Sequence, residues 1–227
     1  GAGTPVKPPS SVTFTSDYGD PSTCDFYVWG EQMFLWLTSP DRDGLVLDGG
    51  AFLNVSIEDA DGQRTFLPNV DGQPLNLALR SEKLGEAGQA GSAGVLFSQQ
   101  GSMVYYGVHT NTEYGYFLTG QKGGAFPDAT DFPRNAADLK ALEAFVAATY
   151  PGTTLPTPET LVMELKTAWV DAETVPDPSA YITIEGIVPD YPALDGAAGP
   201  CLGMTECKWD LTSTRPMTLA LVGVHVV

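Results

Sequence analysis

The sequence predicts an α+β fold that is mostly β, built as an antiparallel sheet or a β-sandwich with two peripheral helices at about residues 22–38 and 135–150. Three observations predict this class. The 25 Gly and 18 Pro residues follow no fixed period, which is typical of many turns between short strands. Apolar residues make up 43% of the chain, enough to fill a core. Two segments have helical apolar spacing, whereas the other apolar runs are short and rich in β-branched or aromatic residues.

The first helix is predicted at residues 22–38, where Ser22 or Thr23 can cap its beginning. Apolar residues recur at helical spacing along it: Phe26, Trp29, Met33, Trp36 and Leu37. Such an aromatic stripe can serve as a ligand platform, but at this spacing it is more often core. We therefore expect this stripe to be buried.

Short strands are predicted between the two helices. Residues 51–57 and 65–67 are typical of hairpin strands. Residues 94–98, 103–110 and 114–119 are separated by Gln-Gln-Gly-Ser and Asn-Thr-Glu turns, which predicts a meander of three adjacent antiparallel strands.

The second helix is predicted at residues 135–150. Asn135 is placed to cap its beginning, with Asp138 three residues further on. Pro151 and Gly152 then end it. Its apolar stripe consists of Leu139, Leu142, Phe145 and Val146.

The remaining strands are predicted at residues 161–170, 180–188 and 217–227, and the last is the most apolar run of the chain. We expect it to be a central strand. Residues 1–20 are interpreted as an extended tail and residues 21–227 as a single β-rich domain. Because the sequence stops at Val227 inside this apolar run, we also expect a missing or separate C-terminal segment that covers it and acts as a partner.

The charge balance excludes one class of partner. Asp and Glu total 28 against 11 Lys and Arg, which gives a formal net charge of −17. Such a surface repels phosphate backbones, so nucleic acid is not an expected partner. No apolar stretch reaches the length of about 18 residues that a membrane-spanning helix needs. The acidic excess is typical of a secreted or periplasmic protein, or of one from a salty environment where cations screen the repulsion.

Three cysteines are present, and two of them enclose a short loop. Cys201 and Cys207 are predicted to form a structural disulfide in an oxidising compartment, the alternative being two reduced thiols in a loop. Cys24 is left over and is interpreted as buried packing material, because a lone Cys usually behaves as a small apolar residue.

The two histidines lie in the same local pattern, Gly-Val-His, and give the main candidate site. Strand alternation places His109 and His225 each on the same face as a glycine, which leaves space beside the imidazole. If the strands are neighbours, Glu164 and Lys166 can join them. Two imidazoles and a carboxylate suit a transition metal such as zinc, or acid–base chemistry. The competing interpretation is that each His is an ordinary sheet residue and that Glu164 pairs with Lys166.

Two acid-rich turns resemble the start of a calcium loop, with Asp41, Asp43, Asp59 and Asp61 as candidate ligands. Neither turn has the downstream bidentate Glu that a complete loop requires. Ordinary Asp-Gly turns explain both better, and weak surface binding of calcium is the alternative.

Several runs together resemble a family of uncharacterised exported bacterial proteins, some of which occur alongside cytochrome c-type domains. The runs are CDFYVW (24–29), QAGS (89–92), VYYGVH (104–109), ELKTAW (164–169) and LVGVHVV (221–227). The resemblance covers about residues 24–227 and implies export and a β-rich body, but no reaction and no catalytic residues. The family continues past the last strand into a segment with Trp and a Phe-Glu-His run, which this sequence lacks.

These observations favour an exported, acidic, non-enzymatic binding domain whose ligand is a carbohydrate or a protein, since exposed aromatic side chains stack on either. The alternative is a metal-dependent or acid–base enzyme that uses His109, His225 and Glu164. The resemblance adds a third hypothesis, a partner of redox proteins.

Overall fold

The structure, a computed structural model, describes residues 23–41, 44–55, 65–68, 73–77, 96–122, 135–152, 155, 162–189 and 214–226. Only the backbone is described for residues 23–26, 67–68 and 121–122. The predicted tail at residues 1–20 and the predicted disulfide between Cys201 and Cys207 lie outside the described residues.

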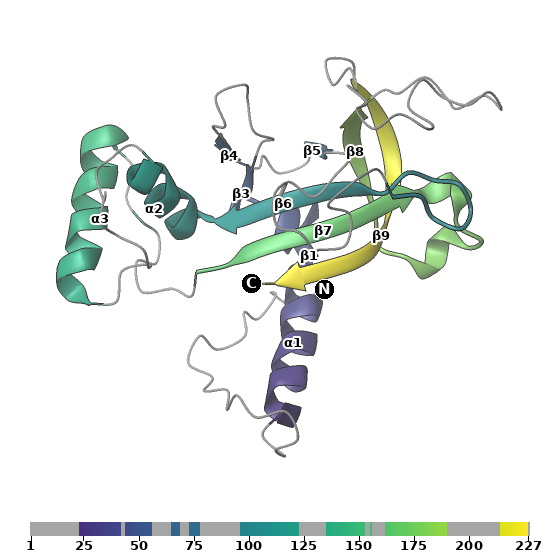
Figure 1. Cartoon of the computed structure of the whole chain (residues 1–227), viewed down its shortest axis with the longest axis horizontal. Helices are drawn as coiled ribbons and strands as arrows, with labels where there is room; N and C mark the ends of the chain where they lie inside the picture. Colours follow the sequence, from purple (N-terminus) through teal and green to yellow (C-terminus); the bar gives the residue numbers. More distant parts are fainter. Residues whose placement is uncertain are drawn as a thin grey trace, which may run out of the picture. The chain divides into compact units, whose positions relative to one another are not determined.

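Within these ranges the chain forms three helices and a seven-stranded sheet, drawn in Figure 1. The helices are α1 (Thr23–Leu37), α2 (Thr112–Lys122) and α3 (Ala136–Thr149). The order across the sheet is β4 (Phe66–Pro68), β3 (Phe52–Val55), β6 (Tyr105–Asn111), β7 (Glu164–Asp171), β9 (Thr214–Val226), β8 (Thr183–Pro189) and β5 (Leu75–Asn76). Strands β1 (Pro40–Asp41) and β2 (Gly44–Leu45) form a separate antiparallel pair. The predicted α+β, mostly β class is confirmed.

The direction of pairing differs from the prediction at one edge of the sheet. Strand β3 is antiparallel to both β4 and β6, and β8 is antiparallel to β9. The short strand β5 is parallel to β8, with Leu75 opposite Gly186. The sheet is therefore mixed, because the long connection between β5 and β8 permits the parallel arrangement that a tight turn forbids.

The chain divides into two compact units. The first comprises residues 1–73, 108–166 and 224–227, and the second comprises residues 74–107 and 167–223. Strands β6, β7 and β9 each run from one unit into the other. One domain over residues 21–227 stays a prediction.

The hydrophobic core of the first unit has two parts. Between α2 and α3, Phe117 packs with Leu142 and Val146. On α1, Met33 and Leu37 are buried. The centroid of the Trp36 ring lies 6.1 Å from the centroid of the Phe52 ring on β3. Of the predicted stripe, the described side chains of Met33 and Leu37 are therefore in the core, and those of Trp29 and Trp36 are half-buried.

In the second unit, strands β8 and β9 carry the core. They form a continuous ladder from Thr183 opposite Ala220 to Pro189 opposite Thr214. Val170, Ala172 and Ala220 form a buried cluster there. Because β9 has β7 on one side and β8 on the other, the prediction that the most apolar run is an interior strand is confirmed.

Helix α3 begins as predicted. The Asn135 side-chain oxygen accepts hydrogen bonds from the N–H groups of Ala137 at 2.9 Å and Asp138 at 3.0 Å. These bonds satisfy two N–H groups that have no partner inside the helix. After the helix, Gly152 adopts a φ of 86°, which favours glycine and ends the helical path.

Residues 114–119, predicted as the third strand of the meander, belong to α2 instead. Tyr114, Phe117 and Leu118 are spaced as on one helix face, and Phe117 is buried against α3. Gly115 explains why the helix fits here, because a β-carbon at this position would overlap Leu53 Cδ1. Of the other two predicted strands, residues 103–110 overlap β6, and in the described part of residues 94–98 a bridge joins Phe97 to Met103.

None of the helices in the described ranges is long and apolar enough to cross a membrane.

Candidate functional site

Polar side chains gather on the buried face of β6 and β3. His109 is fully buried and lies directly opposite Asn54, which is also buried. Directly opposed residues of an antiparallel pair point to the same face, so these two side chains are neighbours. The Trp36–Phe52 ring contact shows that α1 packs against β3 beside them. The imidazole of His109 is therefore away from water.

Burial changes the proton affinity of His109. Removing the imidazole from water disfavours its charged form, which lowers its pKa from 6.5 to about 4. The ring is therefore neutral at pH 7. A neutral imidazole can donate from one nitrogen and accept at the other, so it is compatible with either a core residue or a ligand.

The position of Glu164 relative to His109 follows from the hydrogen bonds between β6 and β7, whose arrows in Figure 1 point in opposite directions. The Asn111 N–H donates to the Met163 carbonyl at 3.1 Å, and the Met163 N–H donates to Asn111 Oδ1 at 3.2 Å. In an antiparallel pair, going back two residues on β6 corresponds to going forward two residues on β7. His109 therefore lies opposite Leu165. Leu165 is buried like His109, so Glu164 points to the other face of the sheet.

Glu164 and Lys166 form an ion pair on that second face. Lys166 Nζ lies 3.5 Å from Glu164 Oε1, and both side chains are half-buried. The charge of Glu164 also acts on the phenol of Tyr114, at the start of α2. Its pKa is raised, first by burial and second by the negative charge of Glu164. Glu164 thus interacts with a lysine and influences a phenol.

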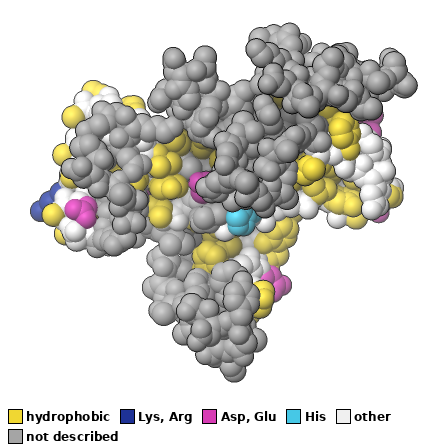
Figure 2. Space-filling model, viewed as in Figure 1, with side chains coloured by type: hydrophobic (Ala, Val, Ile, Leu, Met, Phe, Trp, Pro, Cys, Tyr) yellow, Lys and Arg dark blue, Asp and Glu magenta, His cyan; other side chains and the backbone are white. Residues whose placement is uncertain are grey.

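His225 belongs to the same face as this ion pair. A β-carbon on Gly223 would lie 3.6 Å from Ala168 Cβ, so these two residues share a face. Because side chains alternate along a strand, His225 lies on the same face as Gly223. Lys166 and Glu164 lie on the same face as Ala168. His225 is exposed, and Figure 2 shows a histidine side chain at the surface. The space expected beside its glycine is occupied by Ala168.

The structure thus places three of the four predicted site residues, Glu164, Lys166 and His225, on one face of the sheet and His109 on the opposite face. An exposed imidazole on the same face as a carboxylate already paired with lysine provides no second imidazole for a shared site. The competing interpretation, in which Glu164 pairs with Lys166, agrees with the observed contact.

The metal predictions concern residues that the structure describes only in part. Among the described residues, no group of three or more His, Cys, Asp and Glu side chains is arranged to hold a metal ion. Asp41 is exposed in β1. Asp43, Asp59 and Asp61 lie outside the described residues, as does the side chain of Cys24.

A second surface was not singled out from the sequence, and it lies on α1. Four large apolar side chains project from the helix with exposed fractions of 65% for Tyr27, 51% for Val28, 40% for Phe34 and 57% for Leu35. They lie at i, i+1, i+7 and i+8, which is one side of a helix. The exposed carboxylate of Glu31 lies at i+4, within the same side. We call these five residues the α1 outer face.

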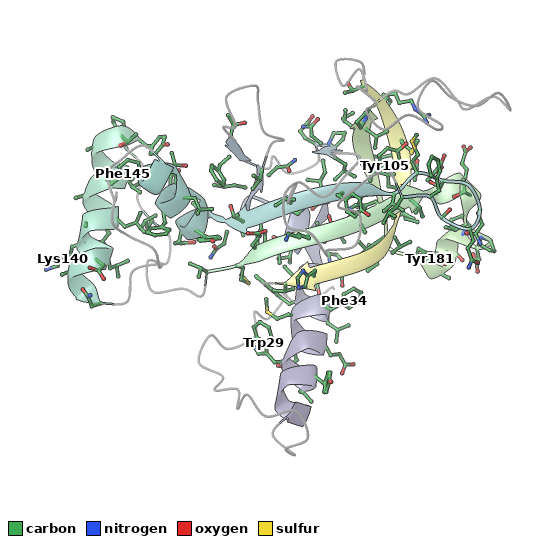
Figure 3. All side chains as sticks on the ribbon, viewed as in Figure 1. Trp29, Phe34, Tyr105, Lys140, Phe145 and Tyr181 are labelled. Carbon is green, nitrogen blue, oxygen red and sulfur yellow. The ribbon has the colours of Figure 1, made fainter. Side chains whose placement is uncertain are left out.

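The outer face is distinct from the side of α1 that enters the core. Figure 3 shows Trp29 and Phe34 leaving the helix on different sides, and Trp29 is half-buried whereas Phe34 is exposed. Figure 2 shows hydrophobic and acidic side chains along one side of α1. Soluble proteins seldom expose several adjacent large apolar side chains unless they serve an interaction.

Comparison with known proteins assigns no function to these residues. No family model, curated protein or solved structure matches the chain. The resemblance to exported bacterial proteins, drawn from short runs, stays a prediction.

Proposed function

We propose that this chain is a non-enzymatic binding domain that recognises a protein partner through the α1 outer face. One observation carries the proposal: Tyr27, Val28, Phe34 and Leu35 are exposed on one side of a helix whose other side is in the core. Covering these side chains removes apolar surface from water and so favours association.

The composition of this face favours protein over carbohydrate. A sugar site combines an aromatic platform with several polar groups that bond to the sugar hydroxyls. On the outer face only the Tyr27 hydroxyl and the Glu31 carboxylate are polar. The apolar side chains of this face lie at i, i+1, i+7 and i+8. Apolar anchors seven residues apart on one side of a helix are typical of helix-to-protein recognition.

We also propose that the protein acts outside the cytoplasm, in a secreted or periplasmic setting. The net charge of −17 and the close spacing of Cys201 and Cys207 support this proposal. Peptide mapping of the non-reduced, alkylated protein tests it, with Cys201 and Cys207 expected in one cross-linked peptide. Alkylation of both thiols would remove this support.

The binding proposal is tested by selecting partners for the full chain from a display library of helical peptides with varied apolar faces. Selected peptides are then measured against a Leu35→Asp variant. We expect their affinity to fall at least about tenfold, because a carboxylate placed in an apolar contact is taken out of water without a partner, which typically costs more than about 1 kcal/mol.

The matched control is Tyr181→Asp, an exposed apolar residue in the second unit. We expect this variant to bind the peptides as the unmodified chain does. Both substitutions are at exposed positions, and unchanged thermal unfolding shows that the fold is retained. Peptides that bind the Leu35→Asp variant as tightly as the unmodified chain would contradict the proposal.

A further inference from the structure

The α1 outer face also defines the chemistry of its partner, an inference that rests on the function proposed above. We infer that the partner is an amphipathic helix with a Lys or Arg near the middle of its apolar stripe, which docks with its backbone close to Gly30 and its cation against Glu31.

The first argument is charge. Glu31 lies four residues after Tyr27 and four before Leu35, so a partner that covers these two side chains also encloses the carboxylate. A carboxylate taken out of water is costly unless it is paired and hydrogen-bonded. Helix α1 contains no Lys or Arg, and the whole chain has a net charge of −17. A cation on the partner would supply the pairing that α1 itself does not offer.

The second argument is the glycine inside the helix. Gly30 is exposed, and a β-carbon built on it would meet no atom within 4 Å. A helix-interior Gly costs about 1 kcal/mol relative to Ala. Within the part of the chain that is described, neither crowding nor a positive φ requires glycine at this position. Gly30 leaves a notch between Tyr27 and Phe34, where another backbone can approach closely.

A second copy of this chain fits the face less well. Two-fold association places the same residues opposite each other, and Glu31 is at the middle of the outer face. Two carboxylates would then meet without a counter-charge, which disfavours the contact. An anionic lipid surface is disfavoured for the same reason, because the acidic chain repels it.

The test uses the selected library peptides and two pairs of variants of the full chain. We expect the peptides to be enriched in Lys or Arg near the middle of their apolar stripe. Glu31→Lys should weaken their binding at least about tenfold, whereas Glu143→Lys, exposed on α3, should not. Gly30→Ala should weaken binding at least about tenfold while it raises the unfolding temperature. Gln32→Ala, on the same helix but at the edge of the outer face opposite to Gly30, is the control and should leave binding unchanged.

The outcomes separate the inference from the proposed function. If the peptides depend on Leu35 but show no basic enrichment and tolerate both Glu31→Lys and Gly30→Ala, the inference is overturned and the binding function stands. If no selected peptide depends on Leu35, both are overturned. The inference also fails if sedimentation shows a dimer, or flotation shows binding to phosphatidylcholine vesicles, that Leu35→Asp abolishes.

Discussion

His109 on β6 and Asn54 on β3 lie directly opposite each other on a buried face of the sheet. Their position beside α1 gives the first unit a titratable group that has no access to water. The consequence is a dependence of stability on pH that can be assigned to a single residue.

Stability should fall as the pH is lowered from about 6.5 to about 4, because the unfolded chain then binds a proton at His109 that the folded chain does not. The gap between the two pKa values corresponds to about 3 kcal/mol in the free energy of unfolding at pH 4 and below, relative to pH 7. Urea unfolding of the unmodified chain and of His109→Gln, measured across this range, checks it. The difference between the two proteins isolates the histidine from the 28 acidic residues.

The control for this experiment is His225→Gln, since His225 is exposed. Its stability profile with pH should follow that of the unmodified chain. A His109→Gln profile that runs parallel to the unmodified chain between pH 4 and pH 6.5 would show that the imidazole is not buried in solution.

Asn111→Ala should destabilise the chain by about 1–3 kcal/mol, because it leaves the buried N–H of Met163 without its side-chain acceptor. The main-chain bond from Asn111 to the Met163 carbonyl is retained, so the loss reports on the side chain alone. Denaturant unfolding measures it. A loss below about 0.5 kcal/mol, the usual effect of a surface substitution, would mean that this contact does not hold β6 to β7.

Glu164→Gln should lower the pKa of Tyr114 toward its ordinary value of 10.0 without reaching it, because the burial that is its larger cause remains. Tyr106 is the internal control, since its pKa is raised by burial alone. Titration of the tyrosine ring carbons by NMR distinguishes the two residues. An unchanged Tyr114 titration in this variant would place Glu164 away from the phenol.

The same substitution should have opposite effects in two helices. Gly30→Ala should raise the free energy of unfolding by up to about 1 kcal/mol, because its methyl group meets open space and Ala favours helix. Gly115→Ala should lower it by about 1–3 kcal/mol, because its methyl group overlaps Leu53 and lies 3.1 Å from Thr110 Oγ1. Thermal and urea unfolding measure both, and equal signs would contradict this account of the packing.

The sequence was most informative where local chemistry decides the structure. Asn135 and Asp138 mark the beginning of α3, and the stripe through Leu142 and Val146 is buried as expected. It was least informative at α2, because Tyr114-Gly115-Tyr116 alternates like a strand. The helix is favoured by contacts between distant segments, namely those of Phe117 with α3 and the close approach of Leu53 to Gly115.

The candidate site was predictable only in part for a similar reason. Alternation within one strand shows that Glu164 and Lys166 share a face, and they do pair. Which face of β7 adjoins His109 depends on the register between strands, which no local pattern fixes. The α1 outer face was not predicted, because the stripe that includes Met33 and Leu37 is enough to explain the helical spacing of the apolar residues. The exposed residues Tyr27 and Leu35 belong to a second apolar stripe on the same helix. A second stripe is the feature of the sequence that could have indicated a binding surface.

The most direct test of the central claim, that α1 is a protein-binding surface, is NMR mapping of the full chain with a selected helical peptide added. This account predicts that the largest chemical-shift changes occur at Tyr27, Val28, Phe34 and Leu35, with little change at Lys166 or His225. Changes centred on Lys166 and His225, with the α1 signals unaffected, would contradict it.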